Sequence, residues 1–142
     1  MKQRLSLPYL LYFAWLIALF SMLGSLYFSE ILHFVPCSLC WWERVCLFPL
    51  VLILGIASFR SDCRIIIYAF PLAMGGLFIA LFHYLQQKGP AFLHMDFCDR
   101  YNPCTQDPLN LLNFITLPLL AAACFLCIAI LLYVAAQIAR RN

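Results

Sequence analysis

The sequence predicts an all-α membrane protein: a bundle of four transmembrane helices with both termini in the cytoplasm. Hydrophobic residues make up 65 % of the 142 residues and charged residues 11 %, and the mean hydropathy is +0.93. An ordinary soluble domain is about 45–50 % apolar and about 25 % charged, and one soluble core of this size could not bury so much apolar surface. We therefore expect a single integral membrane domain over residues 1–142 in contact with the lipid bilayer. The net charge of +3 is too small and too scattered for nucleic-acid binding.

The first helix is predicted near residues 7–28. Lys2 and Arg4 precede its apolar run, as they would in a signal peptide. The run is much longer than the roughly 7–15-residue core of a signal, and no clear small-x-small cleavage site follows it. We interpret the run as a retained membrane span.

The remaining helices are predicted near residues 37–59, 65–85 and 114–137, because a span needs about 20 mostly apolar residues. The second is apolar without interruption only from Val45 onward. Its first two turns, with Trp41 and Trp42, are therefore expected in the membrane interface. A proline lies inside each of these three spans, where neighbouring helices can satisfy the carbonyls that it frees. These prolines are Pro49, Pro71 and Pro118.

Six basic residues predict the orientation, because short cytoplasmic loops are enriched in Lys and Arg. Four spans place all six on one side: Lys2, Arg4, Arg60, Arg64, Arg140 and Arg141. The opposite, outer side then receives a short link near 29–36 and a longer loop near 86–113.

The eight cysteines fall into two groups under this topology. Two close pairs face the oxidising outer side, where disulfides persist: Cys37 with Cys40, and Cys98 with Cys104. The other four are expected to be bystanders, three packed within spans and one reduced in the cytoplasmic turn. These four are Cys46, Cys124, Cys127 and Cys63.

The pair Cys37 and Cys40 follows Pro36, which is favoured at the first position of a helix. Both thiols are then expected in the first turn, where the helix N-terminus stabilises a thiolate. Arg44 continues the same stripe, favours the thiolate further and needs a partner or ligand at the lipid boundary. A redox role is favoured for this pair. The alternatives are a structural staple or half of a zinc site, with Cys98 and Cys104 as further ligands.

Cys98 and Cys104 are separated by five residues rich in turn formers. A disulfide between them is accessible to an incoming thiolate, whereas the alternative is a plain loop staple. His83, near the outer end of the third span, is either a ligand contact or a boundary residue donating to a backbone carbonyl. Glu43 is either the ion partner of Arg44 or an interfacial side chain.

Two outer disulfides imply electron flow, because thiol–disulfide exchange moves two electrons through mixed disulfides. The chain has no haem-attachment motif, no dinucleotide-binding fingerprint and no domain large enough for a flavin. A lipid-soluble quinone, which takes two electrons at the membrane boundary, is therefore the expected acceptor.

The motif Pro36-Cys-x-x-Cys40 followed by Trp42-Glu43-Arg44, with a short cytoplasmic turn and a later outer cysteine pair, resembles the bacterial disulfide-bond formation protein B (DsbB) family. The resemblance covers nearly the whole chain, and the compact outer loop is similar to the BdbC-like branch. It implies a protein-disulfide oxidoreductase of the bacterial cytoplasmic (inner) membrane. Such an enzyme reoxidises a DsbA-like, thioredoxin-like thiol oxidase on the periplasmic or extracytoplasmic side and passes the electrons to ubiquinone or menaquinone.

The resemblance also implies roles for single residues. Cys98 of the Cys98–Cys104 disulfide would form the mixed disulfide with the partner, and Cys104 would then exchange with Cys37. Cys40 would contact and reduce the quinone beside Arg44, while His83 matches the quinone site only loosely. The compact loop departs from the best-known members, which leaves the order of the loop cysteines open.

Three other interpretations remain open. A vitamin K epoxide reductase-like protein has similar parts, but its loop pair precedes a Cys-x-x-Cys in the last span, where this chain has Cys124 and Cys127. A thiolate metal carrier would bind copper or zinc tightly without reducing quinone. A purely structural subunit would show no redox consequence of Cys37→Ser.

Overall fold

The computed structural model describes residues 2–33, 35–88 and 116–141. They form four long helices with two short helical turns. The elements are α1 (Lys2–Leu26), the π-helical turn η1 (Tyr27–Ile31), α2 (Ser38–Arg60), the 3₁₀ turn η2 (Cys63–Ile65), α3 (Ile66–Lys88) and α4 (Leu117–Arg141). All four helices are long and apolar enough to cross a membrane. The predicted four-helix transmembrane bundle is confirmed.

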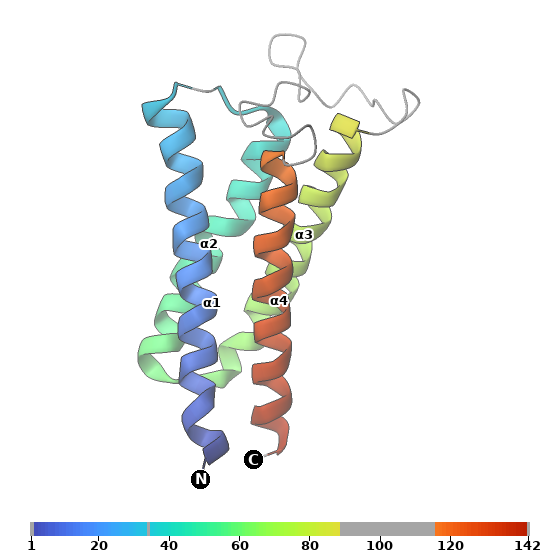
Figure 1. The fold of residues 1–142 in the computed structure, drawn as a ribbon. Coiled ribbons are helices and arrows are strands. Elements are labelled where there is room, and N and C mark those ends of the chain that lie inside the picture. The colour runs from blue at the N-terminus through green and yellow to red at the C-terminus, as the bar shows by residue number, and fades with distance from the viewer. Residues whose placement is uncertain (1, 34, 89–115, 142) are drawn as a thin grey trace.

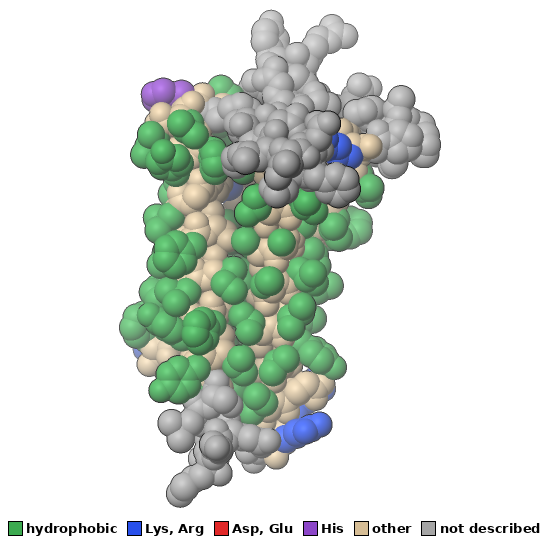
Figure 2. Space-filling view, in the orientation of Figure 1, with side chains coloured by type: hydrophobic (Ala, Val, Ile, Leu, Met, Phe, Trp, Pro, Cys, Tyr) green, Lys and Arg blue, Asp and Glu red, His purple; other side chains and the backbone are tan. Residues whose placement is uncertain are grey.

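The helices stand side by side, and the two chain ends lie at the same end of the bundle (Figure 1). The η2 turn between α2 and α3 lies at that end too, whereas η1, the start of α2 and the end of α3 lie at the other. Hydrophobic side chains cover the visible face between these two ends (Figure 2). We call the end that holds η1 and the start of α2 the cysteine end.

The predicted boundaries are wrong by a few residues at several places. The first helix runs beyond 7–28 because the chain continues through η1 to Ile31, so the predicted link near 29–36 is helical in its first part. The third helix continues to Lys88, so residues 86–88 of the predicted outer loop are helical. The fourth begins at Leu117 rather than 114. Residues 89–113 of that loop lie outside the described residues.

Each helix buries one stripe at helical spacing, as expected for a bundle. On α3 the stripe consists largely of small residues that let α4 approach closely: Ala69, Ala73, Gly76 and Ala80. The approach is so close at Gly76 that a Cβ there would overlap the ring of Phe125 on α4. Pro49 and Pro71 lie inside α2 and α3 as predicted.

The buried stripes become polar toward the cysteine end. On α3 the row of small residues continues to His83, which is buried. On α2 the row that contains Leu47, Val51 and Leu54 begins with Arg44, which is also buried. The same register that builds the apolar core therefore turns a histidine and an arginine into the bundle.

Candidate functional site

Cys37 and Cys40 stand at the start of α2. Cys37 is the residue that caps the helix, with an extended backbone (φ −72°, ψ 172°), and its carbonyl accepts a bond from the N–H of Trp41. The helix itself begins at Ser38, so the prediction that Pro36 occupies the first helical position is wrong. Cys40 alone lies in the first turn. Both cysteines are free thiols, and their sulfurs are 3.3 Å apart and share a hydrogen bond.

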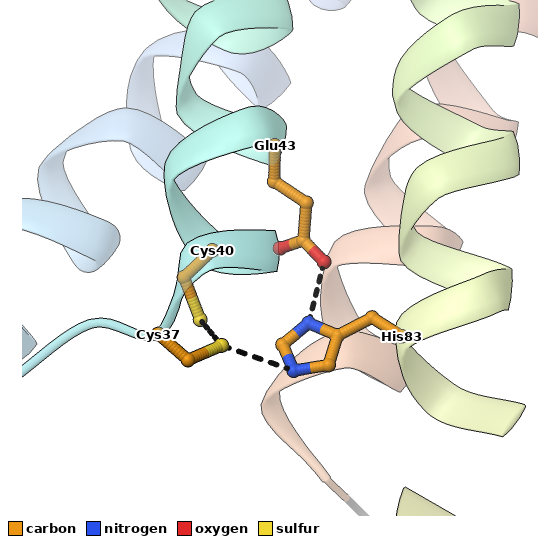
Figure 3. Close-up of polar contacts among 4 residues, drawn as sticks. All are labelled: Cys37, Cys40, Glu43 and His83. Atoms are coloured by element: carbon orange, nitrogen blue, oxygen red, sulfur yellow. Dashed lines mark hydrogen bonds and ion pairs between the residues drawn. The ribbon is translucent and has the colours of Figure 1, made fainter. Parts of the chain in front are cut away.

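A chain of polar contacts runs from Glu43 of α2 through His83 of α3 to Cys37 and on to Cys40 (Figure 3). The ring Nδ1 lies 2.9 Å from Oε1 of Glu43, and Nε2 lies 3.5 Å from Sγ of Cys37. The His83 side chain is 3 % exposed and the Glu43 side chain 13 %. A carboxylate on one ring nitrogen fixes the orientation of the other toward its target. His83 is therefore held against the sulfur rather than against a backbone carbonyl.

The surroundings of Cys37 favour its thiolate. The hydrogen bond with Cys40 lowers the pKa of the Cys37 thiol, burial opposes this, and the hydrogen bond with His83 lowers the pKa again, to about 4. The thiolate is the nucleophilic form of cysteine. Cys37 is therefore ready for exchange with another disulfide well below neutral pH.

Arg44 finds its partner on α1. Its Nε donates to Oγ of Ser25 at 2.9 Å and its Nη2 donates to the Ser25 carbonyl at 2.8 Å. Its Cζ also lies 5.3 Å from the ring centre of Trp41, within cation–π range. The alternative in which Glu43 is the ion partner of Arg44 is wrong, because the carboxylate of Glu43 bonds His83 instead. The guanidinium is thus fixed at two of its nitrogens.

A cavity of about 520 Å³ opens between the helices at the cysteine end. Its wall contains Cys37, Cys40, Glu43, Arg44 and His83, and most of the remaining lining is apolar, with phenylalanines and leucines from α1, α2 and α4. Ligand pockets are typically about 300–1,000 Å³, mainly apolar, with a few placed polar groups. The cavity has the size and the lining of a site for a largely apolar small molecule.

Of the remaining described cysteines, only Cys124 lines the same cavity as the pair. Cys46 and Cys63 are partly buried and pack against the core, whereas Cys127 is exposed on α4. Cys124 was expected to pack within its span, but it is partly buried in the wall of the cavity. The expectation of packing is wrong for Cys127, which is exposed, and holds only in part for Cys124, which is half-buried and lines the cavity.

The structure thus brings together four of the six predicted site residues, Cys37, Cys40, Arg44 and His83. The other two, Cys98 and Cys104, lie outside the described residues. Ser25 was missed, although the spacing of Leu11, Ala14 and Ala18 extends to it at intervals of three and four residues.

The model of the family described as "Disulfide bond formation protein DsbB" matches residues 7–136. Disulfide bond formation protein C of Bacillus subtilis is 48 % identical over 130 residues, which are 92 % of each chain. A probable disulfide formation protein of Chlamydia trachomatis is 46 % identical over 91 % of this chain and 93 % of its own.

A second probable disulfide formation protein, from Coxiella burnetii, is 45 % identical over 84 % of this chain and 82 % of its own. No solved structure matches the chain. The family match and these relatives, together with four membrane-spanning helices and a paired Cys-x-x-Cys, show that the chain belongs to the DsbB family and is a membrane disulfide oxidoreductase of disulfide-bond formation.

Proposed function

We propose that this protein oxidises a DsbA-like thiol oxidase on the outer side of the bacterial cytoplasmic membrane and transfers the electrons to a membrane quinone, ubiquinone or menaquinone. In the net reaction the partner dithiol loses two electrons and two protons and becomes a disulfide. The quinone gains both and becomes a quinol. The chain itself returns to its starting state after each turnover.

The observation that carries the proposal is the cavity. It brings an apolar volume of about 520 Å³ against the Cys37–Cys40 pair and the Arg44 guanidinium. A quinone head group needs an apolar wall for its ring and a hydrogen-bond donor for its oxygen. The two bonds to Ser25 use only two of the five N–H groups of a guanidinium, which makes Arg44 a suitable donor.

Cys37 and Cys40 have different roles in the proposed relay. Cys37, with its low pKa and its contact with His83, is suited to exchange with the reduced outer loop. Cys104 attacks its sulfur, and Cys37 then leaves as a stable thiolate when Cys98 re-forms the loop disulfide. Cys40 follows it by one turn and lies closer along α2 to Arg44, so it is the sulfur that reduces the quinone. His83, held by Glu43, orients toward the sulfur of Cys37 and can hold or release a proton at Nε2.

The outer loop supplies the second disulfide, Cys98–Cys104, by the family pattern. Cys98 forms the mixed disulfide with the partner, the partner's second thiol releases it, and Cys104 then exchanges with Cys37. The positive-inside distribution of Lys and Arg supports the outer location of all four cysteines. In the described residues, Arg60 is the last residue of α2 and Arg64 lies in η2, at the end of the bundle opposite the start of α2.

The test is quinone-dependent turnover of purified protein with a reduced thioredoxin-like partner. Cys40→Ser and Cys104→Ser are expected to abolish oxidation of the partner, whereas Cys46→Ser and Cys127→Ser, outside the site, retain it. Arg44→Ala is expected chiefly to raise the quinone requirement. Turnover that survives Cys40→Ser or Cys104→Ser would refute the relay, and an unchanged quinone dependence would remove Arg44 from the site.

A further inference from the structure

Three potential ligand atoms of a metal ion converge at the cysteine end. The sulfurs of Cys37 and Cys40 and a ring nitrogen of His83 all lie within 4.8 Å of one another. The ligands come from two helices, so their convergence is a property of the packing between α2 and α3 rather than of local sequence. Figure 3 shows both sulfurs and the Nε2 edge of the ring turned toward one another.

We propose that the dithiol form of Cys37 and Cys40, together with His83, is a binding site for a thiophilic divalent cation of the Zn²⁺ type. The bound cation holds the pair reduced and blocks its reoxidation. The blocking of reoxidation rests on the proposed function, whereas the binding site does not.

The distances between the ligand atoms, all within 4.8 Å, are close to those of tetrahedral zinc coordination for the two pairs that include Cys37. With Zn–S about 2.3 Å and Zn–N about 2.0–2.1 Å, a tetrahedral site separates sulfur from nitrogen by about 3.5 Å and two sulfurs by about 3.8 Å. The observed distance from Sγ of Cys37 to Nε2 of His83 is 3.5 Å. The two sulfurs are 3.3 Å apart, so they need to separate by about 0.5 Å, within the reach of a small side-chain rotation.

Glu43 completes the pattern around the histidine. A metal-bound histidine usually donates its second ring N–H to a carboxylate, which fixes the tautomer and the ring orientation. The contact of 2.9 Å between His83 Nδ1 and Glu43 Oε1 is this arrangement. When Nδ1 carries the proton and donates it to Glu43, Nε2 is left with a lone pair that points to the sulfurs.

The chemistry balances without electron transfer. Each cysteine binds as a thiolate, so a cysteine that is still protonated releases its proton when the cation enters, and no residue is oxidised. Two thiolates neutralise the charge of the cation. Three protein ligands leave one position for water, as in catalytic zinc sites of the Cys₂His type. The disulfide form has no thiolate to offer, so the site exists only after reduction.

The experiment uses the full-length reduced protein in detergent and Co²⁺ as a spectroscopic probe of the zinc site. We expect one Co²⁺ to bind per chain and to give a thiolate-to-cobalt charge-transfer band. Zn²⁺ should displace the Co²⁺ and abolish the band. His83→Ala should reduce the affinity by at least tenfold, and Glu43→Gln by about 10–100-fold. Cys46→Ser and Cys127→Ser are the matched controls and should bind like the wild type.

The double variant Cys98→Ser/Cys104→Ser separates this site from a four-cysteine site. Retained binding in that variant supports the proposal, and lost binding overturns it in favour of ligands from the outer loop. Affinity that is independent of His83 also overturns it, because two thiolates alone are then sufficient, as they would be for a monovalent copper ion.

A turnover measurement keeps the two proposals apart. Micromolar Zn²⁺ should inhibit quinone-dependent turnover, and a chelator should restore it. Active protein that binds no Co²⁺ would refute the metal site and leave the proposed function intact. Protein that binds Co²⁺ at Cys37, Cys40 and His83 but never reduces quinone would support the metal site and refute the proposed function.

Discussion

Removing the His83 imidazole should change the way in which the reactivity of Cys37 depends on pH. In the structure His83 Nε2 lies 3.5 Å from the Cys37 sulfur and helps to lower the pKa of that thiol to about 4. His83→Ala removes this hydrogen bond but leaves the contact with Cys40, which is the larger cause of the low pKa. Loss of this hydrogen-bonded, charge-stabilising neighbour raises the pKa of the Cys37 thiol, so we expect its thiolate to form at a higher pH in the variant.

The size of the pKa shift decides whether a single reaction rate or a pH profile reports it. At pH 6 a thiol with an ordinary pKa of about 8.5 is about 0.3 % thiolate, so a pKa of about 4 raises the thiolate fraction about 300-fold. The same shift lowers the nucleophilicity of each thiolate by about 60–180-fold, because the Brønsted coefficient is about 0.4–0.5. The two effects nearly cancel, leaving a net gain of about 2–5-fold. The shape of the pH profile, rather than a single rate, therefore reports the pKa.

The assay is alkylation of the reduced, quinone-free protein by iodoacetamide, with the modified sulfur identified by tandem mass spectrometry. The rate at Cys37 should be constant from about pH 5.5 to pH 8 in the wild type, because the thiolate is already formed there. In His83→Ala the rate should fall about tenfold per pH unit below the new pKa. A wild-type rate that rises through pH 8, or a variant profile identical to the wild type, would refute the role of His83.

His33→Asn is the matched control. His33 is an exposed histidine in the link before α2, and its positive φ of 51° is a conformation that asparagine tolerates. Its replacement should leave the profile of Cys37 unchanged. A shift as large as that of His83→Ala would show that the effect does not come from the contact of His83 with the sulfur.

Two further predictions test the positioning of the site and the packing beneath it. Ser25→Ala removes the hydroxyl that accepts from Arg44 but leaves the carbonyl contact. The apparent KM for quinone should therefore rise about 2–10-fold in steady-state turnover. An unchanged KM would show that Ser25 does not position Arg44 for quinone. Gly76→Ala should lower the stability by about 1–3 kcal/mol in thermal unfolding, because its Cβ overlaps the Phe125 ring. Gly75→Ala, whose Cβ meets nothing within 4 Å, should be neutral or stabilising, and equal losses in the two variants would contradict the close packing of α3 on α4.

The helices could be predicted from the sequence because uncharged length alone decides whether a segment can span a membrane. The residues at which the helices begin and end could not be predicted, because capping and local hydrogen bonds determine them. Because the backbone of Cys37 is extended, α2 begins at Ser38 rather than at the predicted residue 37. The π-helical η1 extends the first span to Ile31.

The site was partly predictable for a related reason. The Cys-x-x-Cys spacing and Arg44 are local signals on one helix, so they could be read directly. The contact of His83 with Cys37 and the bonds of Arg44 with Ser25 join different helices, and their distances depend on how the bundle packs. Glu43 shows the limit most clearly, because its neighbour in sequence is Arg44 but its partner is His83 on α3.

We propose that electrons from a protein dithiol leave through Cys40 to a quinone. The most direct measurement is the amount of quinol and of oxidised partner formed in the same anaerobic sample, followed by absorbance and by thiol titration. We expect one quinol for each partner disulfide in the wild type and neither product above background in Cys40→Ser. Partner oxidation without quinol, or quinol formation that persists in Cys40→Ser, would contradict it.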